Sequence, residues 1–124
     1  MSKAKDNITS LADGQNFVFG SNLNGFHAGG AAKIALENFG AEWGNPKGQQ
    51  GRSYAIPTLD ENMDKIFLED IKESLEQLFE YARQRPDEVW FLTPVGTGIA
   101  GYSIEDLESI LPEKLPENIN PTWK

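Results

Sequence analysis

Two glycine-rich segments constrain the fold of this 124-residue chain more than any other feature of its sequence. Each segment follows a short apolar run, NFVFG at residues 16–20 and VWFLT at residues 89–93. Such runs, ending at turn residues, are typical of buried strands, and a helical pattern follows both. We therefore expect each segment to connect a strand to a helix. They are called here the first glycine-rich loop, residues 20–30, and the second glycine-rich loop, residues 96–102.

The rest of the chain continues this alternation of strands and helices. Helices are expected at residues 31–39, at residues 66–85 and from Ser103, which has the capping-box spacing to Asp106. Further strands are expected at residues 53–57 and near 118–119, whereas residues 41–52 lack a period and are expected to form a loop. Strands that alternate with helices predict an α/β fold, here a three-layer α/β/α sandwich around a mostly parallel sheet.

The composition of the chain excludes several classes of protein and of functional site. Residues 1–15 are polar and are expected to form an N-terminal arm, and residues 16–124 are expected to form one domain. The chain has no cysteine and one histidine, which excludes disulfide scaffolds, thiol nucleophiles and two-histidine metal motifs, so neither a metal nor a cofactor is expected. Because no apolar run approaches the ~20 residues that span a bilayer, no membrane partner is expected and a cytoplasmic location is predicted.

Charge is distributed unevenly along the chain, whose net charge is −8. Residues 1–52 hold five Lys and Arg against four Asp and Glu, whereas residues 53–124 hold six against fifteen. The overall sign argues against a nucleic-acid backbone as the main partner. An anionic ligand is better tolerated near the first half, where backbone N–H groups would have to hold it because basic side chains are few.

Both glycine-rich loops are expected at the same edge of the sheet, since each follows a parallel strand. Their glycines let a ligand approach the backbone, and the helix that follows each loop offers free N–H groups and the positive end of its dipole. This arrangement predicts a site for a phosphate or a diphosphate. The competing interpretation is that each loop is a long turn, because neither contains the P-loop or the G-x-G-x-x-G spacing.

Two side chains in the first glycine-rich loop are candidates for catalysis. Asn22 either contacts sugar hydroxyls and orients a water or caps the loop backbone. His27 either acts as a general base or forms a structural hydrogen bond. In the second loop, Tyr102 either stacks on the ligand or covers the core, and Trp90 is expected in the core. The paired carboxylates, such as Asp60 and Glu61, are expected on helix caps and solvated faces.

The segments FVFGSNLNGFHAGGAAKIALENFGA, RSYAIPT and VWFLTPVGTGIAGYSIEDL together resemble the macro domain family. The resemblance extends over residues 16–111 and is greatest to small macro-like proteins of phages and bacteria. It implies a compact sandwich that binds ADP-ribose or a related nucleotide. By position, Asn22 matches the asparagine that addresses the distal ribose, with Asn24 as a competing match, and Asp6 is the nearest counterpart of the acidic residue that contacts adenine.

The resemblance also implies which residues contact the ligand. The first loop and the helix start would contribute Gly20, Ser21, Asn22, Gly29, Gly30 and Ala31, and the second loop would contribute Thr97, Gly98, Ile99, Ala100, Gly101 and Tyr102. Some members of the family only bind ADP-ribose, and others hydrolyse its derivatives. Binding of an ADP-ribose-like nucleotide is therefore the leading hypothesis. The alternatives are an ADP-ribosyl hydrolase or ADP-ribose phosphatase that uses Asn22 and His27, and a partner-binding protein that has lost the ligand.

Overall fold

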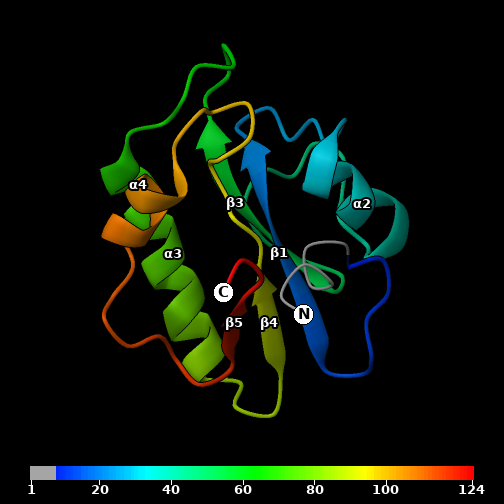
Figure 1. The fold of residues 1–124 in the computed structure, drawn as a ribbon. Coiled ribbons are helices and arrows are strands. Elements are labelled where there is room, and N and C mark those ends of the chain that lie inside the picture. The colour runs from blue at the N-terminus through cyan, green and yellow to red at the C-terminus, as the bar shows by residue number, and fades with distance from the viewer. Residues whose placement is uncertain (1–7) are drawn as a thin grey trace.

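The protein is described by a computed structural model that covers residues 8–124 (Figure 1). Among these residues a five-stranded sheet carries three helices. The strands are β1 (Gln15–Asn22), β2 (Gly48–Gln50), β3 (Ser53–Leu59), β4 (Val89–Leu92) and β5 (Ile119–Pro121). The helices are α2 (Gly30–Asn38), α3 (Leu68–Arg83) and α4 (Ile104–Ser109). The predicted α/β class is confirmed.

The sheet has the strand order β2-β3-β1-β4-β5. The central strand β1 pairs in parallel with β3 on one side and with β4 on the other, and β4 pairs in parallel with β5. The three strands expected from the apolar runs therefore lie in one sheet and run in the same direction. Their carboxyl ends meet at one edge, at the top of Figure 1, and both glycine-rich loops leave from that edge.

Alternation along the strands sends buried side chains to both faces of the sheet. On one face, Val18, Tyr54 and Trp90 pack with residues of α3 and α4 in the main core. On the other face, Phe17 and Phe19 pack against α2 in a second core. Figure 1 shows the same division, with α3 and α4 on one side of the sheet and α2 on the other. Trp90 is completely buried, as the sequence predicted.

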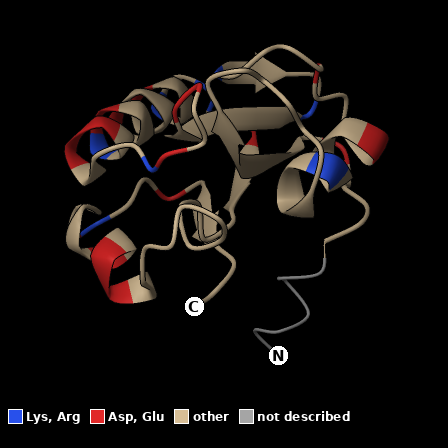
Figure 2. Ribbon diagram, turned by 90° about the horizontal axis from the view of Figure 1, so that it is seen from above, with Lys and Arg blue, Asp and Glu red and all other residues tan. Residues whose placement is uncertain are grey.

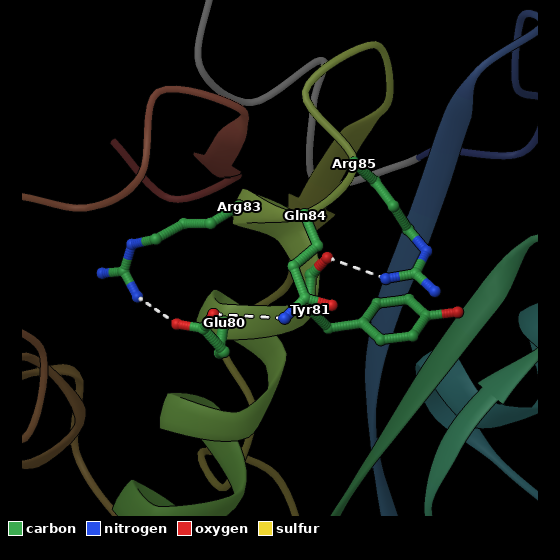
Figure 3. Close-up of polar contacts among 5 residues, drawn as sticks. All are labelled: Glu80, Tyr81, Arg83, Gln84 and Arg85. Atoms are coloured by element: carbon green, nitrogen blue, oxygen red, sulfur yellow. Dashed lines mark hydrogen bonds and ion pairs between the residues drawn. The ribbon is translucent and has the colours of Figure 1, made fainter.

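The long helix α3 is two residues shorter at each end than the predicted span of 66–85. Its predicted apolar stripe is buried and consists of Ile71, Leu75, Leu78, Phe79 and Ala82. Figure 3 shows the polar contacts of side chains at the end of this helix. Nη1 of Arg85 donates to the Tyr81 carbonyl oxygen at 3.1 Å, and its guanidinium lies 3.4 Å from the centroid of the Tyr81 ring. Glu80 pairs with Arg83 at 3.5 Å.

One expectation about a connecting segment is corrected. Residues 41–52 contain strand β2, which pairs antiparallel with β3 at the end of the sheet. A three-residue edge strand held by backbone pairing is too short to produce a period in its side chains. Within the predicted N-terminal arm, Ile8 and Leu11 pack against the second core. Residues 1–7, with the candidate Asp6, lie outside the described residues.

Candidate ligand-binding site

A pocket of about 420 Å³ lies at the carboxyl edge of the sheet, between the two glycine-rich loops. The ends of β1 and β3 form its floor together with Thr93 and Pro94, which follow β4. The start of α2 lines one side, and residues 96–100 of the second loop line another. The parallel pairing of β1 with β3 and β4 is what brings these segments together from distant parts of the sequence.

The structure brings together all but two of the residues predicted to bind the ligand. Those that line the pocket are Gly20, Ser21, Asn22, Gly29, Gly30, Ala31, Thr97, Gly98, Ile99 and Ala100. Gly101 and Tyr102 do not line it. Gly101 has a φ of +80° and donates its N–H to the Gly98 carbonyl oxygen at 2.9 Å, closing a turn. Tyr102 packs against the main core and donates its hydroxyl to the Ile66 carbonyl oxygen at 2.6 Å.

The start of α2 presents unpartnered N–H groups to this pocket. Gly29 caps the helix and has no side chain with which to accept a hydrogen bond, and no acidic residue stands in the first turn. The first N–H of the helix that finds a main-chain acceptor belongs to Lys33, which donates to the Gly29 carbonyl oxygen at 3.2 Å. Within residues 8–124, the N–H groups of Gly30, Ala31 and Ala32 have no acceptor. An anion is the natural acceptor for such groups.

The second glycine-rich loop supplies a second set of N–H groups. Thr97 donates to the Pro94 carbonyl oxygen at 3.3 Å, and Tyr102 donates to that of Gly96 at 2.9 Å, which folds the loop back on itself. The N–H groups that find no acceptor in the described part of the chain are those of Gly96, Gly98, Ile99 and Ala100. All four residues line the pocket. Successive free N–H groups in a turn make a concave site for an anion.

The start of the helix after the second loop does not line the pocket, although we expected its dipole to act on the ligand. Its N-cap, Ser103, forms the predicted capping box with Asp106. The Ser103 hydroxyl accepts the Asp106 N–H at 3.0 Å, and the Asp106 carboxylate accepts the Ser103 N–H at 3.0 Å. Glu105 adds another carboxylate to the first turn. The positive end of α4 is therefore already compensated by its own side chains.

The hydroxyl groups around the pocket donate hydrogen bonds to backbone carbonyl oxygens. Thr93 donates to the Val18 carbonyl oxygen at 2.6 Å, Thr97 to that of Pro94 at 2.7 Å, and Thr58 to that of Ser21 at 3.2 Å. The Ser21 hydroxyl donates to the Pro46 carbonyl oxygen. Each of these hydroxyls can still accept a hydrogen bond from a ligand, but its own proton is committed.

Asn22 and His27 have structural partners. The Asn22 amide donates to the Phe26 carbonyl oxygen and accepts the Phe26 N–H, both at 3.0 Å. His27 is completely buried, and its Nε2 lies 3.1 Å from the Asn45 carbonyl oxygen. A carbonyl oxygen only accepts, so Nε2 carries the proton in this bond. Asn22 lines the pocket, whereas His27 does not.

The pocket is uncharged. Its lining contains no Asp, Glu, Lys, Arg or His side chain among residues 8–124. Figure 2 looks down on this edge of the sheet and shows the helices α3 and α4 carrying much of the acidic colour. Burial raises the pKa of the Tyr54 hydroxyl, with a further increase from Tyr81 and an opposing effect of Arg85, but Tyr54 lies in the main core and does not line the pocket.

Phe26 and Met63 are among the apolar residues at the pocket that the sequence did not indicate. Met63 has a φ of +65°, in a loop that Asp60 organises by accepting the N–H groups of Asn62 and Asp64 at 2.8 and 3.0 Å. A non-glycine residue in this conformation is uncommon and often lies near a functional site. The turn residues at 60–62 indicated a loop, but nothing in them indicated that it reaches the pocket.

A larger hollow of about 730 Å³ lies elsewhere, between the end of α3 and residues 114–118. Charged side chains line it, among them Arg83, Lys114 and Glu117, and Asn118 there donates to the carbonyl oxygens of Ala82 and Arg85 at 2.8 and 3.1 Å. It adjoins the carboxyl end of α3, where the helix dipole disfavours anions. We therefore assign the candidate site to the smaller pocket.

Residues 8–124 contain neither a metal-binding cluster nor a membrane-spanning helix. No group of three or more His, Cys, Asp or Glu residues is placed to hold a metal ion there. None of the helices in the same part of the chain has the length and apolar character needed to cross a membrane.

Comparisons of this chain with protein-family models, with curated proteins and with solved structures found no match.

Proposed function

We propose that this protein binds ADP-ribose or a related nucleotide diphosphate in the pocket between the two glycine-rich loops. One observation carries the proposal: two sets of unpartnered N–H groups, at Gly30–Ala32 and at residues 96 and 98–100, belong to residues that line one uncharged pocket. A diphosphate offers an acceptor to each set. Hydrogen bonds to a charged acceptor contribute about 1.5–3 kcal/mol each, which compensates for the missing basic side chains.

The architecture is compatible with the same proposal. Helices on both faces of a mostly parallel sheet agree with a three-layer sandwich of the macro type, to which the loop sequences are similar. In sheets of this kind, ligands bind beyond the carboxyl ends of the strands. The volume of about 420 Å³ lies within the range of small-molecule pockets, about 300–1,000 Å³.

No observation favours the alternative of an ADP-ribosyl hydrolase or phosphatase. Such an enzyme needs a group that moves a proton, and the lining contains no titratable Asp, Glu, Lys or His within residues 8–124. The amide of Asn22 is engaged with Phe26, and His27 is buried against Asn45. We therefore propose a binding module rather than an enzyme.

The test is a thermal-shift panel followed by calorimetry with ADP-ribose, NAD, ADP and inorganic phosphate. Binding predicts that ADP-ribose raises the melting temperature and gives a saturable heat. Release of ADP-ribose from a modified protein, lost in Asn22→Ala, would replace this proposal with the hydrolase. No shift with any of these compounds would favour the third alternative, a protein that kept the fold and binds a partner.

A further inference from the structure

Two large aromatic side chains are stacked on each other at the mouth of the pocket. The rings of Phe26 and Trp43 are 5.4 Å apart between centroids and 16° from parallel. Phe26 is 50% exposed and Trp43 is 56% exposed. Phe26 lines the pocket, and Trp43 does not. Trp43 thus covers one face of the Phe26 ring, and the other face is available to a ligand in the pocket that Phe26 lines. We call this pair the aromatic platform.

Contacts within the loops hold the aromatic platform in place. The Asn22 amide fixes the backbone of Phe26 through two hydrogen bonds of 3.0 Å. The segment that carries Trp43 is joined to the first glycine-rich loop by the Gly44 N–H, which donates to the Gly25 carbonyl oxygen at 2.8 Å. The two backbones approach so closely that a Cβ on Gly25 would lie 2.4 Å from the Gly44 carbonyl carbon, so only glycine fits there.

Two more contacts join the first glycine-rich loop to the segment that carries Trp43. The buried ring of His27 bonds to Asn45 at 3.1 Å, and the Ser21 hydroxyl donates to Pro46. The ring of Phe19 meets that of His27 edge to face, at 5.1 Å between centroids. Asn22 and His27, candidates for catalysis from the sequence, therefore act as positioning residues for the aromatic platform.

We propose that the aromatic platform is a subsite for a planar heteroaromatic ring of the ligand, which stacks on the uncovered side of Phe26. The inference rests on the proposed function, because the free N–H groups would hold the phosphates of the same ligand. The pair is apolar and about half exposed, and Phe26 lines the same pocket as the residues that carry those N–H groups. The ring is recognised by its face rather than by its edge, because no charged side chain lines the pocket in that part of the chain.

The test compares Phe26→Leu with Phe67→Leu by calorimetry with ADP-ribose. Phe67 is 77% exposed and does not line the pocket, so it is the matched control. Stacking of one base predicts that Phe26→Leu weakens binding by about 5- to 100-fold, while Phe67→Leu and the conservative Phe26→Tyr retain it. A proton NMR spectrum of ADP-ribose bound to the native protein should show upfield shifts of the adenine protons from the ring current of Phe26.

Each other outcome overturns the inference in a distinguishable way. If native protein binds ADP-ribose and Phe26→Leu binds it equally well, the ring lies elsewhere, and the proposed function stands. If affinity falls but the adenine protons of the native complex show no upfield shift, Phe26 only maintains the loop, and the inference is wrong. If native protein binds no ADP-ribose, the proposed function and this inference fail together.

Discussion

The two glycine-rich loops are both rich in glycine and have similar places in the fold, yet they offer an anion different hydrogen-bond donors. The first leads into α2, whose N-cap is Gly29 and whose first turn contains no acidic residue. The second leads into α4, which begins with a complete capping box and two carboxylates. The start of α2 lines the pocket and the start of α4 does not, so the first loop brings a helix start to the site and the second brings the N–H groups of its own turn.

The difference shows that glycine content alone does not define a phosphate site. Capping side chains decide whether the N–H groups at the start of a helix remain available to a ligand. A serine at the N-cap with an aspartate three residues later engages the N–H groups of those two residues, here Ser103 and Asp106, whereas a glycine offers no such acceptor. Four variants and one change of conditions separate the two loops experimentally.

The largest effect is expected from Gly98→Val in the second loop. A Cβ at Gly98 meets no heavy atom within 4 Å, and its φ is not positive, so the variant should fold normally. The side chain would obstruct the neighbouring N–H groups. Loss of two hydrogen bonds to a charged ligand predicts a fall in affinity of about 100-fold or more, measured by calorimetry with ADP-ribose.

Gly101→Ala is the matched control for that variant. Gly101 has a φ of +80° and does not line the pocket, so alanine there should lower the free energy of unfolding by about 1 kcal/mol. Its affinity for ADP-ribose should remain close to native. Native affinity in Gly98→Val would contradict the role given to this loop.

Gly29→Asp places a carboxylate at the start of α2. This variant should raise stability and weaken binding of ADP-ribose. Gly29 has an extended backbone, and a Cβ there meets no atom within 4 Å. The new carboxylate would accept the free N–H groups and favour the helix by about 0.3–1 kcal/mol. We expect a higher melting temperature and about tenfold weaker ADP-ribose binding. An increase in both would mean that α2 does not contact the ligand.

Ser103→Ala is the reciprocal variant at α4 and should affect stability alone. Removing the capping hydroxyl is expected to lower the free energy of unfolding by about 1 kcal/mol, measured by urea denaturation. Affinity should stay within about twofold of native, because the start of this helix does not line the pocket. A marked change in affinity at unchanged fold would show that α4 takes part in binding after all.

The smallest effect is expected from pH. The pocket lining has no titratable Asp, Glu, His or Lys side chain within residues 8–124. Binding of ADP-ribose should therefore vary by less than about twofold between about pH 6 and pH 9, followed by calorimetry. A bell-shaped dependence would instead point to an acid–base group and to the hydrolase alternative.

The sequence predicted the strands, the helices and the meeting of both loops at one edge, because these follow from apolar periodicity and from the geometry of parallel sheets. It did not predict that β2 lies at the end of the sheet, since three backbone-paired residues leave no periodic signal. The aromatic platform was also missed. The contact between Phe26 and Trp43 joins residues from two separate loops, and no local pattern encodes it.

The candidate site was predictable to the level of the loops rather than of single side chains. Tyr102 belongs to the second loop, but it turns away to Ile66, and His27 belongs to the first loop, but it is buried against Asn45. Glycine and helix patterns specify where a backbone turns. Only the packed structure shows whether a side chain in such a turn faces the pocket or the core.

The most direct test of the central claim is a nitrogen-15 NMR titration of the native protein with ADP-ribose. We predict that the amide signals of Gly30, Ala31 and Ala32 shift together with those of Gly98, Ile99 and Ala100, while the signals of Ile104 and Glu105 at the start of α4 remain in place. Saturable shifts confined to residues 114–118, or no shifts at either glycine-rich loop, would contradict it.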